Sequence, residues 1–295
     1  MPPEPSSIAV VGAGGFLGTA LTSAATLAGV PVDAYTRAEP ALRPDGRMDA
    51  RLARAGTVFW LATSVNPALA ESHPERAAAD LETFTAALRA LGSLPRPPKV
   101  ALLSSGGAVY DTTGPPPYRE ESPTRPRGAY GRSKLALEQA LASAGLPAGH
   151  AVSLRVSNLY GPGQPSVGGQ GVIGYWLRAA AAGDHLTVYG DPGTTRDYVY
   201  VDDVTSALLA VHAAATLPPV VNLGAGRGTS LRELADLLLG IVDDPRLRLE
   251  LRPARGFDVP HSWLDVRLAE SVLGWTARTG LTEGLTRCWD SVPVA

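Results

Sequence analysis

Tyr130 and Lys134 are the residues of this sequence whose types and spacing best fit chemistry. They stand four positions apart in Ala129-Tyr-Gly-Arg-Ser-Lys134, and residues four apart share one face of a helix. A lysine ammonium beneath a phenol favours the phenolate, so we expect the pKa of Tyr130 to fall below its ordinary value of about 10. Such a tyrosine can donate or remove a proton at a hydroxyl near neutral pH. The same spacing also occurs by chance on surface helices, so a second signal is needed.

A glycine run about 110 residues upstream supplies that signal. Gly12, Gly15 and Gly18 follow a short apolar strand and open an amphipathic helical stretch. Glycines in this context let the backbone turn tightly and approach a pyrophosphate, which rests on the helix N-terminus. The alternative is a glycine-rich turn without a ligand. We predict a dinucleotide site formed by Gly12, Gly14, Gly15, Phe16, Leu17, Gly18, Thr36, Arg37, Leu61, Ala62, Ser104, Tyr130 and Lys134.

Thr36 and Arg37 bear on which dinucleotide binds, because they follow the second predicted strand. An NAD enzyme usually has an acidic residue there, which accepts a hydrogen bond from the ribose 2'-hydroxyl. Threonine and arginine can instead hydrogen-bond and pair with a 2'-phosphate, which a carboxylate would repel. We therefore predict that NADP(H) is preferred, with NAD(H) as the alternative cofactor. In the competing interpretation, Arg37 is only a solvated loop residue.

The composition argues against several classes of protein. The 295 residues include 26 basic and 28 acidic side chains, a near balance that disfavours nucleic acid or an acidic membrane as partner. The single cysteine allows no internal disulfide and fits a reducing cytoplasm. The N-terminus lacks the charged segment of a signal peptide, and no apolar run reaches the roughly 18 residues of a spanning helix. We expect a cytoplasmic protein with no membrane segment and no metal site.

The pattern of apolar runs predicts an α/β fold with a Rossmann-type, doubly wound parallel sheet. We predict a dinucleotide-binding core over residues 1–163 and a smaller C-terminal α/β, mainly substrate-binding region over 164–295. Some elements of the second region are expected to return to the core. The predicted strands are 8–11, 32–35, 57–61, 100–103, 151–156, 186–189, 220–223 and 247–251. The predicted helices are 16–28, 75–91, 130–144, 172–182, 201–214, 231–242, 266–273 and 282–290.

With both motifs placed, the chain resembles an extended short-chain dehydrogenase/reductase of the NAD-dependent epimerase/dehydratase family, which acts on nucleotide sugars. The resemblance covers nearly the whole chain. So many separate matches in the right order are typical of this family rather than of chance similarity. Besides the two motifs, the matching segments are Leu103–Asp111, Leu154–Gly163, Arg196–Asp203, Asn222–Gly226, Arg255–Asp258 and Leu273–Trp275.

The resemblance implies a nucleotide diphosphate sugar bound between the two regions. In the family, the arginines that match Arg196 and Arg255 clamp the diphosphate, and Asn158 hydrogen-bonds at the same end. Guanidinium groups suit phosphate oxygens, which agrees with this role. The alternative for each arginine is a structural ion pair with Asp197 or Asp258.

The catalytic strand departs from the family pattern at Gly106, where the family has a catalytic Ser or Thr. We predict that Ser105 replaces it as a catalytic and substrate-binding residue. Ser104, or Tyr130 without a third hydroxyl, are the alternatives. A second departure is Trp60, which stands where the family commonly has histidine.

A third departure lies between the second and third predicted strands. About twenty residues separate Thr36 from Thr57, too few for the usual third strand and its helix. The pocket for the adenine is therefore expected to be open.

Two redox functions fit these residues. We predict an NADP(H)-dependent 4-ketoreductase with Tyr130 as general acid. The expected substrate is a dTDP-4-keto-6-deoxyhexose, because the Ala-, Arg-, Pro- and Gly-rich composition suggests a high-GC coding sequence of the kind common in deoxysugar pathways. The alternative is an NAD-dependent 4-epimerase of a UDP- or dTDP-hexose, and a non-catalytic dinucleotide sensor is a less favoured third hypothesis. Dehydration is disfavoured because Ser104–Val109 contains no Asp or Glu.

The resemblance also implies a homodimer, formed by the helices predicted over 75–91 and 130–144. Leu81, Phe84, Leu88 and Leu91 recur at helical spacing in the first of these. The same apolar stripe could instead be buried within one subunit.

Overall fold

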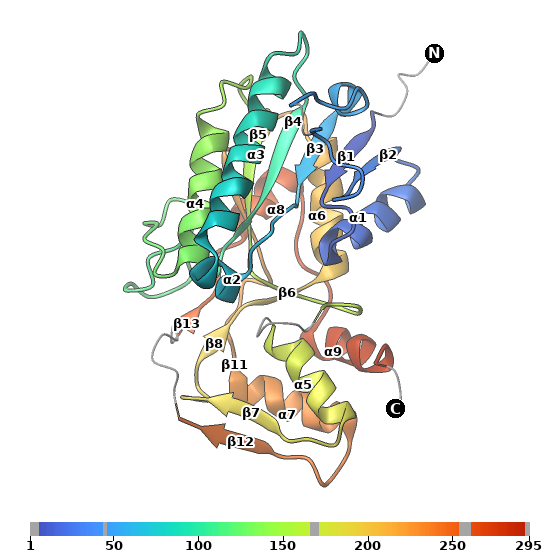
Figure 1. The fold of residues 1–295 in the computed structure, drawn as a ribbon. Coiled ribbons are helices and arrows are strands. Elements are labelled where there is room, and N and C mark those ends of the chain that lie inside the picture. The colour runs from blue at the N-terminus through green and yellow to red at the C-terminus, as the bar shows by residue number, and fades with distance from the viewer. Residues whose placement is uncertain (1–5, 44–45, 166–170, 254–260, 293–295) are drawn as a thin grey trace.

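A computed structural model describes residues 6–43, 46–165, 171–253 and 261–292 (Figure 1). A parallel sheet between two layers of helices forms the upper part in Figure 1, and shorter strands and helices form the lower part. In the described part of the chain, no helix is long and apolar enough to cross a membrane.

The central sheet has six parallel strands in the order β10-β5-β4-β3-β1-β2. Its central strands are short apolar runs with both faces buried, as expected for a parallel sheet covered on each side. This topology confirms the predicted Rossmann-type α/β fold. The strands are β1 Ile8–Val11, β2 Val32–Tyr35, β3 Thr57–Trp60, β4 Lys99–Ser105, β5 Ala151–Val156 and β10 Val220–Leu223.

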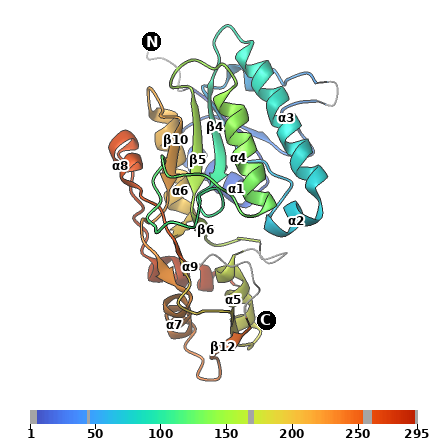
Figure 2. The same ribbon diagram turned by 90° about the vertical axis from the view of Figure 1, so that its left-hand side faces the viewer.

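Two pairs of helices cover the sheet, one pair on each face (Figures 1 and 2). Helices α1 Phe16–Leu27 and α6 Val201–Ala213 pack together on one face, and α3 Pro74–Gly92 and α4 Ala129–Ala142 on the other. Residues of β4 alternate between two hydrophobic clusters, because successive side chains of a strand point to opposite faces. Ala101 belongs to the cluster with α1 and α6, whereas Val100 and Leu102 belong to the cluster with α3 and α4.

The lower part is joined to the sheet through a short parallel pair, β6 Asn158–Tyr160 with β9 Tyr198–Tyr200. A second pair, β7 Leu186–Tyr189 with β12 Leu249–Arg252, carries the outer wall. Strand β10 returns to the main sheet, and α8 Arg267–Leu273 contacts β10 and α6. The other elements are α5 Val172–Ala181, α7 Leu231–Val242, α9 Leu281–Asp290, β8 Thr195–Arg196, β11 Thr229–Ser230 and β13 His261–Ser262.

The structure confirms that the usual third strand is missing, because β2 is the edge strand of the sheet. In its described residues, the segment from β2 to β3 contains a turn of 3-10 helix, η1 Leu52–Arg54, and an isolated bridge between Leu42 and Met48. The sequence did not predict α2 Pro67–Ser72, nor the two- and three-residue strands of the lower part. These elements are too short for hydrophobic periodicity to reveal them.

The apolar stripe on α3 is buried inside the subunit. Phe84, Leu88 and Leu91 are at most 2% exposed, and they belong to the same cluster as Leu137 and Leu141 of α4. These three side chains hold α3 and α4 on the sheet, so they are not available to a partner. The homodimer itself stays a prediction.

The first strand and first helix meet at a crossing that leaves no room for side chains. A Cβ on Gly18 would stand 2.1 Å from the carbonyl oxygen of Gly12, and a Cβ on Gly12 would stand 2.7 Å from the nitrogen of Ala62. Gly12 also has a φ of 98°, which L side chains rarely adopt. The contact therefore requires glycine at both positions.

We expect Gly18→Ala to destabilise the protein by about 1–3 kcal/mol, because the added methyl group must push β1 and α1 apart. Gly240→Ala is the matched control, since Gly240 also lies in a helix but a Cβ there meets nothing within 4 Å. Helix propensity alone favours alanine by up to about 1 kcal/mol at both sites. Urea unfolding midpoints would separate the two; equal stabilisation of both variants would contradict the close crossing.

Candidate active site

The predicted cofactor residues meet at the carboxyl edge of the sheet. The glycine loop follows β1, Leu61 and Ala62 follow β3, and Ser104 and Ser105 end β4. Contacts confirm that these segments touch, because the Leu61 amide donates to the Val11 carbonyl at 2.8 Å and Ala62 packs on Gly12. In open α/β sheets this edge is where ligands bind.

The N-terminus of α1 fits a dinucleotide pyrophosphate. Gly15 is the N-cap residue, no side chain caps the helix, and its first turn holds no acidic residue. The first N–H groups of Phe16, Leu17 and Gly18 therefore have no partner within the helix and carry its positive dipole end. Gly14 and Gly15, which precede the helix, have no side chains to cover these donors, so an anionic group can approach them.

Thr36 and Arg37 lie beside this loop at the end of the edge strand β2. The Thr36 methyl group would be 3.7 Å from a Cβ on Gly14, which places it next to the glycine loop. Arg37 is exposed to solvent. Glu39 folds back on Thr36 through its backbone, donating from its amide to the threonine hydroxyl at 3.3 Å. A cation and a hydroxyl are thus at the position where an acidic residue would select NAD.

Tyr130 and Lys134 share one face of α4, as predicted, but the electrostatic expectation is wrong for the free protein. The Lys134 ammonium lies 5.7 Å from the centroid of the Tyr130 ring. Burial raises the pKa of Tyr130 to about 12, and it lowers the pKa of Lys134 to about 8. The loss of hydration that burial imposes on the phenolate outweighs the attraction of the nearby Lys134 ammonium. Tyr130 is therefore a protonated acid at neutral pH.

A buried polar network that the sequence did not predict fixes α4 on the sheet. The Lys134 ammonium donates to the Leu103 carbonyl at 3.2 Å. One helical turn further, Glu138 accepts a hydrogen bond from the Ser104 hydroxyl and pairs with Arg155 at 2.7 Å. A possible signal was the charged Arg155 inside an apolar strand, since a buried arginine needs a partner. The role of Ser104 in cofactor binding stays a prediction, with its hydroxyl engaged by Glu138.

Ser105 does not face the catalytic helix. Ser104 points toward α4, so the alternation along β4 directs Ser105 to the face covered by α1 and α6. Gly106 follows the end of β4, and a Cβ there would stand 2.6 Å from the buried side chain of Leu264. A serine or threonine there would require the Leu264 side chain to move, and the catalytic role of Ser105 stays a prediction.

Trp60 belongs to the core rather than to the edge of the site. Its side chain is 4% exposed, and its ring centroid lies 4.9 Å from that of Phe84 on α3. Where the family commonly has histidine, this chain thus has a residue that packs α3 against β3.

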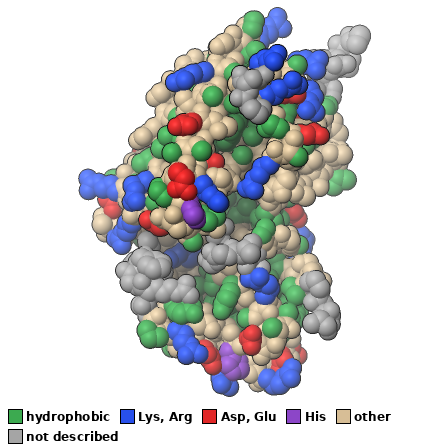
Figure 3. Space-filling model, viewed as in Figure 1, with side chains coloured by type: hydrophobic (Ala, Val, Ile, Leu, Met, Phe, Trp, Pro, Cys, Tyr) green, Lys and Arg blue, Asp and Glu red, His purple; other side chains and the backbone are tan. Residues whose placement is uncertain are grey.

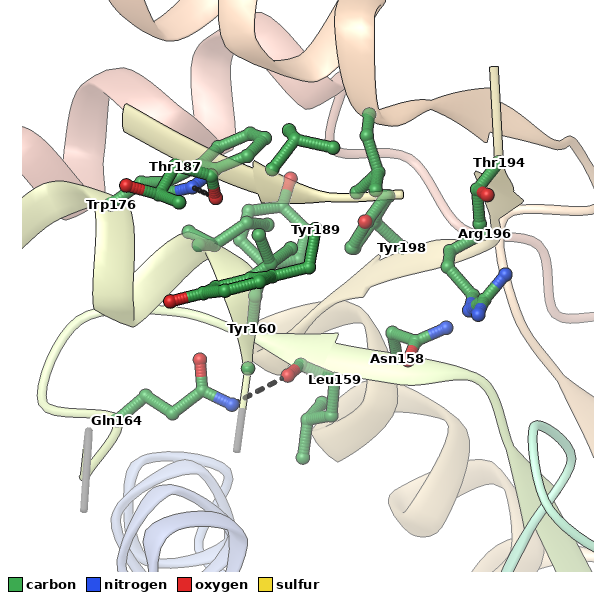
Figure 4. Close-up of a pocket in the computed structure, with 15 residues that line it drawn as sticks. Asn158, Leu159, Tyr160, Gln164, Trp176, Thr187, Tyr189, Thr194, Arg196 and Tyr198 are labelled. Carbon is green, nitrogen blue, oxygen red and sulfur yellow. Dashed lines mark hydrogen bonds between the residues drawn. The ribbon is translucent and has the colours of Figure 1, made fainter. Parts of the chain in front are cut away.

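A cavity of about 300 Å³ lies in the lower part, between β6, β7 and α5 (Figure 4). Asn158 and Arg196 lie at one end of it, and Trp176 and Thr187 at the other. Tyr189, which also lines the cavity, is 37% exposed. The structure thus brings Asn158 and Arg196 together, as predicted, whereas Arg255 lies outside the described residues.

Asp197 does not pair with Arg196. Its buried carboxylate instead accepts hydrogen bonds from the Ser157 hydroxyl and from the amides of Ala225 and Leu264. Burial raises the pKa of Asp197 to about 6 despite these donors. Asp197 therefore holds together four segments of chain beside the cavity, and Arg196 donates from Nη1 to the Thr195 carbonyl at 2.8 Å.

This combination of a parallel sheet, an open helix N-terminus at its carboxyl edge and a Tyr-Lys pair defines a dinucleotide-dependent oxidoreductase fold. A model described as the NAD dependent epimerase/dehydratase family matches residues 8–224. The chain belongs to this family, and it is an NAD(P)-dependent enzyme of the extended short-chain dehydrogenase/reductase type.

Several relatives are similar to this chain. Over 99% of the chain and 98% of the relative, it is 31% identical to a dTDP-6-deoxy-L-talose 4-dehydrogenase (NAD(P)(+)) of Kitasatospora kifunensis. It is 36% identical over 193 residues to a UDP-glucose 4-epimerase of Mycolicibacterium smegmatis, a match to 64% of the chain that spans only 60% of that relative. The structure of a UDP-glucose 4-epimerase from Thermotoga maritima, with UDP-glucose, has a TM-score of 0.83 and 27% identity, covering 97% and 98% of the two chains.

We expect Tyr130 to remain protonated in the free protein well above neutral pH. The ultraviolet signal of tyrosinate, measured as wild type minus Tyr130→Phe, should be absent below about pH 10. The variant loses one hydroxyl, and circular dichroism would check that its fold is retained. A tyrosinate that forms near neutral pH in the free protein would show that Lys134 outweighs burial.

Proposed function

We propose that this protein is an NADP(H)-dependent 4-ketoreductase of a nucleotide sugar, with a dTDP-4-keto-6-deoxyhexose as substrate. The observation that carries this proposal is the pair Thr36 and Arg37 at the end of β2. It favours NADP(H), a cofactor that is exchanged between turnovers in a net reduction. A relative that aligns over 99% of the chain is named a 4-dehydrogenase with NAD(P)(+), and the reverse of such a reaction is reduction at C4.

The cavity in the lower part supports a nucleoside diphosphate as the handle of the substrate. Arg196 and Asn158 provide cationic and amide donors at one end, as a diphosphate requires. Trp176, Thr187 and Tyr189 provide aromatic and polar surface along the rest of the cavity, where a base can stack and hydrogen-bond. A solved relative in this family holds UDP-glucose, which agrees with this class of ligand.

The glycine loop and the N-terminus of α1 would hold the pyrophosphate of the cofactor, and Thr36 and Arg37 its 2'-phosphate. When bound, the reduced nicotinamide supplies the hydride that reduces the C4 carbonyl. Tyr130 donates its proton to the carbonyl oxygen, so that the carbonyl becomes a hydroxyl. Lys134 stabilises the tyrosinate that this step leaves, and the tyrosine regains its proton from solvent before the next turnover.

The segment between β2 and β3 carries several exposed arginines. Arg37, Arg43, Arg47, Arg51 and Arg54 are all exposed on the segment between β2 and β3. Lys and Arg side chains gather over this upper right part of the molecule in Figure 3. Of these, Arg37 directly follows β2 at the carboxyl edge of the sheet, so it is the arginine that supports a contact with the 2'-phosphate.

A second candidate function is NAD-dependent 4-epimerisation. It is favoured by the names of two relatives, the UDP-glucose 4-epimerases of Mycolicibacterium smegmatis and Thermotoga maritima. An epimerase would retain NAD and return the hydride to the opposite face of the same sugar, so it would consume no cofactor. The two functions therefore differ in the stoichiometry of cofactor oxidation.

Purified protein mixed with dTDP-4-keto-6-deoxyglucose is expected to oxidise NADPH in proportion to the sugar reduced, and NADPH faster than NADH. Tyr130→Phe should lower kcat by about 100- to 10,000-fold, because the carbonyl oxygen loses its proton donor. The absorbance of NADPH provides the measurement. No oxidation, with NAD released when the protein is denatured, would reject the reductase and favour the epimerase.

Arg37→Ala should weaken NADPH binding by about tenfold while changing NADH binding little, because one charge-assisted contact to the 2'-phosphate is lost. Titration calorimetry on the free protein would measure both dissociation constants. Arg89→Ala, on the exposed face of α3, is the matched control. Equal weakening of both dinucleotides would show that Arg37 does not read the phosphate.

A further inference from the structure

The polar face of α4 continues one turn beyond the catalytic pair, at Glu138. This carboxylate and the guanidinium of Arg155 on β5 are each only 6% exposed. Arg155 donates to both carboxylate oxygens, from Nη2 at 2.7 Å and from Nε at 3.1 and 3.2 Å. Two ionised groups out of water need such geometry, because an unpaired charge at this depth is costly.

The remaining hydrogen-bonding groups of this pair reach β4 and the loop that carries Glu120, and a ring contact continues to β10. The Ser104 hydroxyl on β4 donates to Glu138, and Arg155 Nη1 donates to the Glu120 carbonyl at 3.1 Å. The guanidinium lies 4.8 Å over the ring of Tyr110, whose hydroxyl donates to Asn222 on β10 at 2.6 Å. The pair therefore links α4 to β4, β5 and β10.

Lys134 makes the neighbouring contact between α4 and β4. Its ammonium donates to the carbonyl of Leu103, the residue next to Ser104 in β4. Two contacts one helical turn apart thus set the position of α4 along β4. We propose that Glu138 and Arg155 are positioning residues of the active site: they hold α4 in register with β4 and present a balanced pair of charges to the Lys134 ammonium beneath Tyr130.

Few other charged groups face Lys134 from the elements packed against α4. Asp80 on α3 has its carboxylate held by the Ser64 amide at 2.7 Å, and it favours the charged lysine. Glu71 on α2 accepts from the Ala129 amide at 2.6 Å, at the start of α4. Burial lowers the pKa of Lys134, and Asp80 and Glu138 oppose that shift. Tyr130 itself is neutral in the free protein.

Replacing either partner of the pair should shift the pKa of Lys134, and the two shifts should have opposite signs. In Glu138→Gln, the positive charge of Arg155 remains alone, so the Lys134 pKa should fall by about one unit. In Arg155→Met, the Glu138 carboxylate remains alone, so the Lys134 pKa should rise by about one unit. The double variant removes both charges and should return close to the wild-type value. A loss of packing alone would not produce opposite signs.

The composition of the chain makes this shift directly measurable. Lys99 and Lys134 are the only lysines in the sequence. Protein labelled with carbon-13 at the lysine ε position should therefore give two side-chain signals in nuclear magnetic resonance spectra. Lys134→Arg assigns them, and Lys99 is an internal reference at the opposite end of β4, donating to the carbonyls of Val211 and Ala214.

The expected result is a Lys134 signal that titrates near pH 8 in the wild type and moves in opposite directions in the two single variants. Glu283→Gln is the matched control, because Glu283 pairs with Arg287 on the exposed face of α9. Shifts of the same sign, or no shift in either folded variant, would overturn the proposal. If Arg155→Met fails to fold, Glu138→Gln and the double variant still decide it, since hydrophobic replacement of a whole buried pair is often tolerated.

The effect on turnover rests on the proposed function, whereas the lysine titration does not. In the reductase, the alkaline limb of the pH profile of kcat should move with the Lys134 titration in each variant. A titration that shifts as expected without any NADPH oxidation would leave the positioning role standing and reject the reductase. NADPH oxidation with an unshifted Lys134 titration would support the reductase and reject the positioning role.

Discussion

Helix α4 directs three ionisable side chains into the protein, and much of the structure around them satisfies those groups. Tyr130, Lys134 and Glu138 follow one another at four-residue intervals on the face that packs against β4. An ordinary helix on a parallel sheet would bury an apolar stripe there. The lysine needs the Leu103 carbonyl, and the glutamate needs Ser104 and Arg155. The same hydrogen bonds and ion pair therefore hold α4 on the sheet and position the side chains of the site.

The free protein thus has an acid rather than a base at Tyr130. Burial acts on Tyr130 and Lys134 in opposite directions, raising the pKa of the phenol and lowering that of the ammonium. Both groups are held nearer to their neutral forms. A protonated tyrosine suits the proposed reduction, in which the first demand on it is to give up a proton. At Gly106, where the family pattern has a hydroxyl, a Cβ would stand 2.6 Å from the buried side chain of Leu264.

The chain also differs from its family pattern at the edge of the sheet. Without a third strand, β2 is the last strand, and an arginine-bearing segment follows it. Of 26 basic residues, two are lysines and 24 are arginines. Both lysines donate to backbone carbonyls inside the protein, at opposite ends of β4, whereas arginines provide the rest of the positive charge. Planar guanidinium groups suit phosphate oxygens, as the proposed ligands require.

The sequence by itself determined the sheet, the main helices, the glycine loop and the Tyr-Lys pair, because each depends on spacing within a short segment. Glycines at 12 and 18 and a four-residue helical interval are readable without knowing what lies opposite. The tertiary structure alone decided which charges meet. Arg155 is 17 residues from Glu138 and Ser104 is 34 residues away, and only the packing of α4 on two strands brings them together. The same holds for the pKa of Tyr130, since burial depends on the whole fold, and for the space at Gly106, which Leu264 fills from far along the chain.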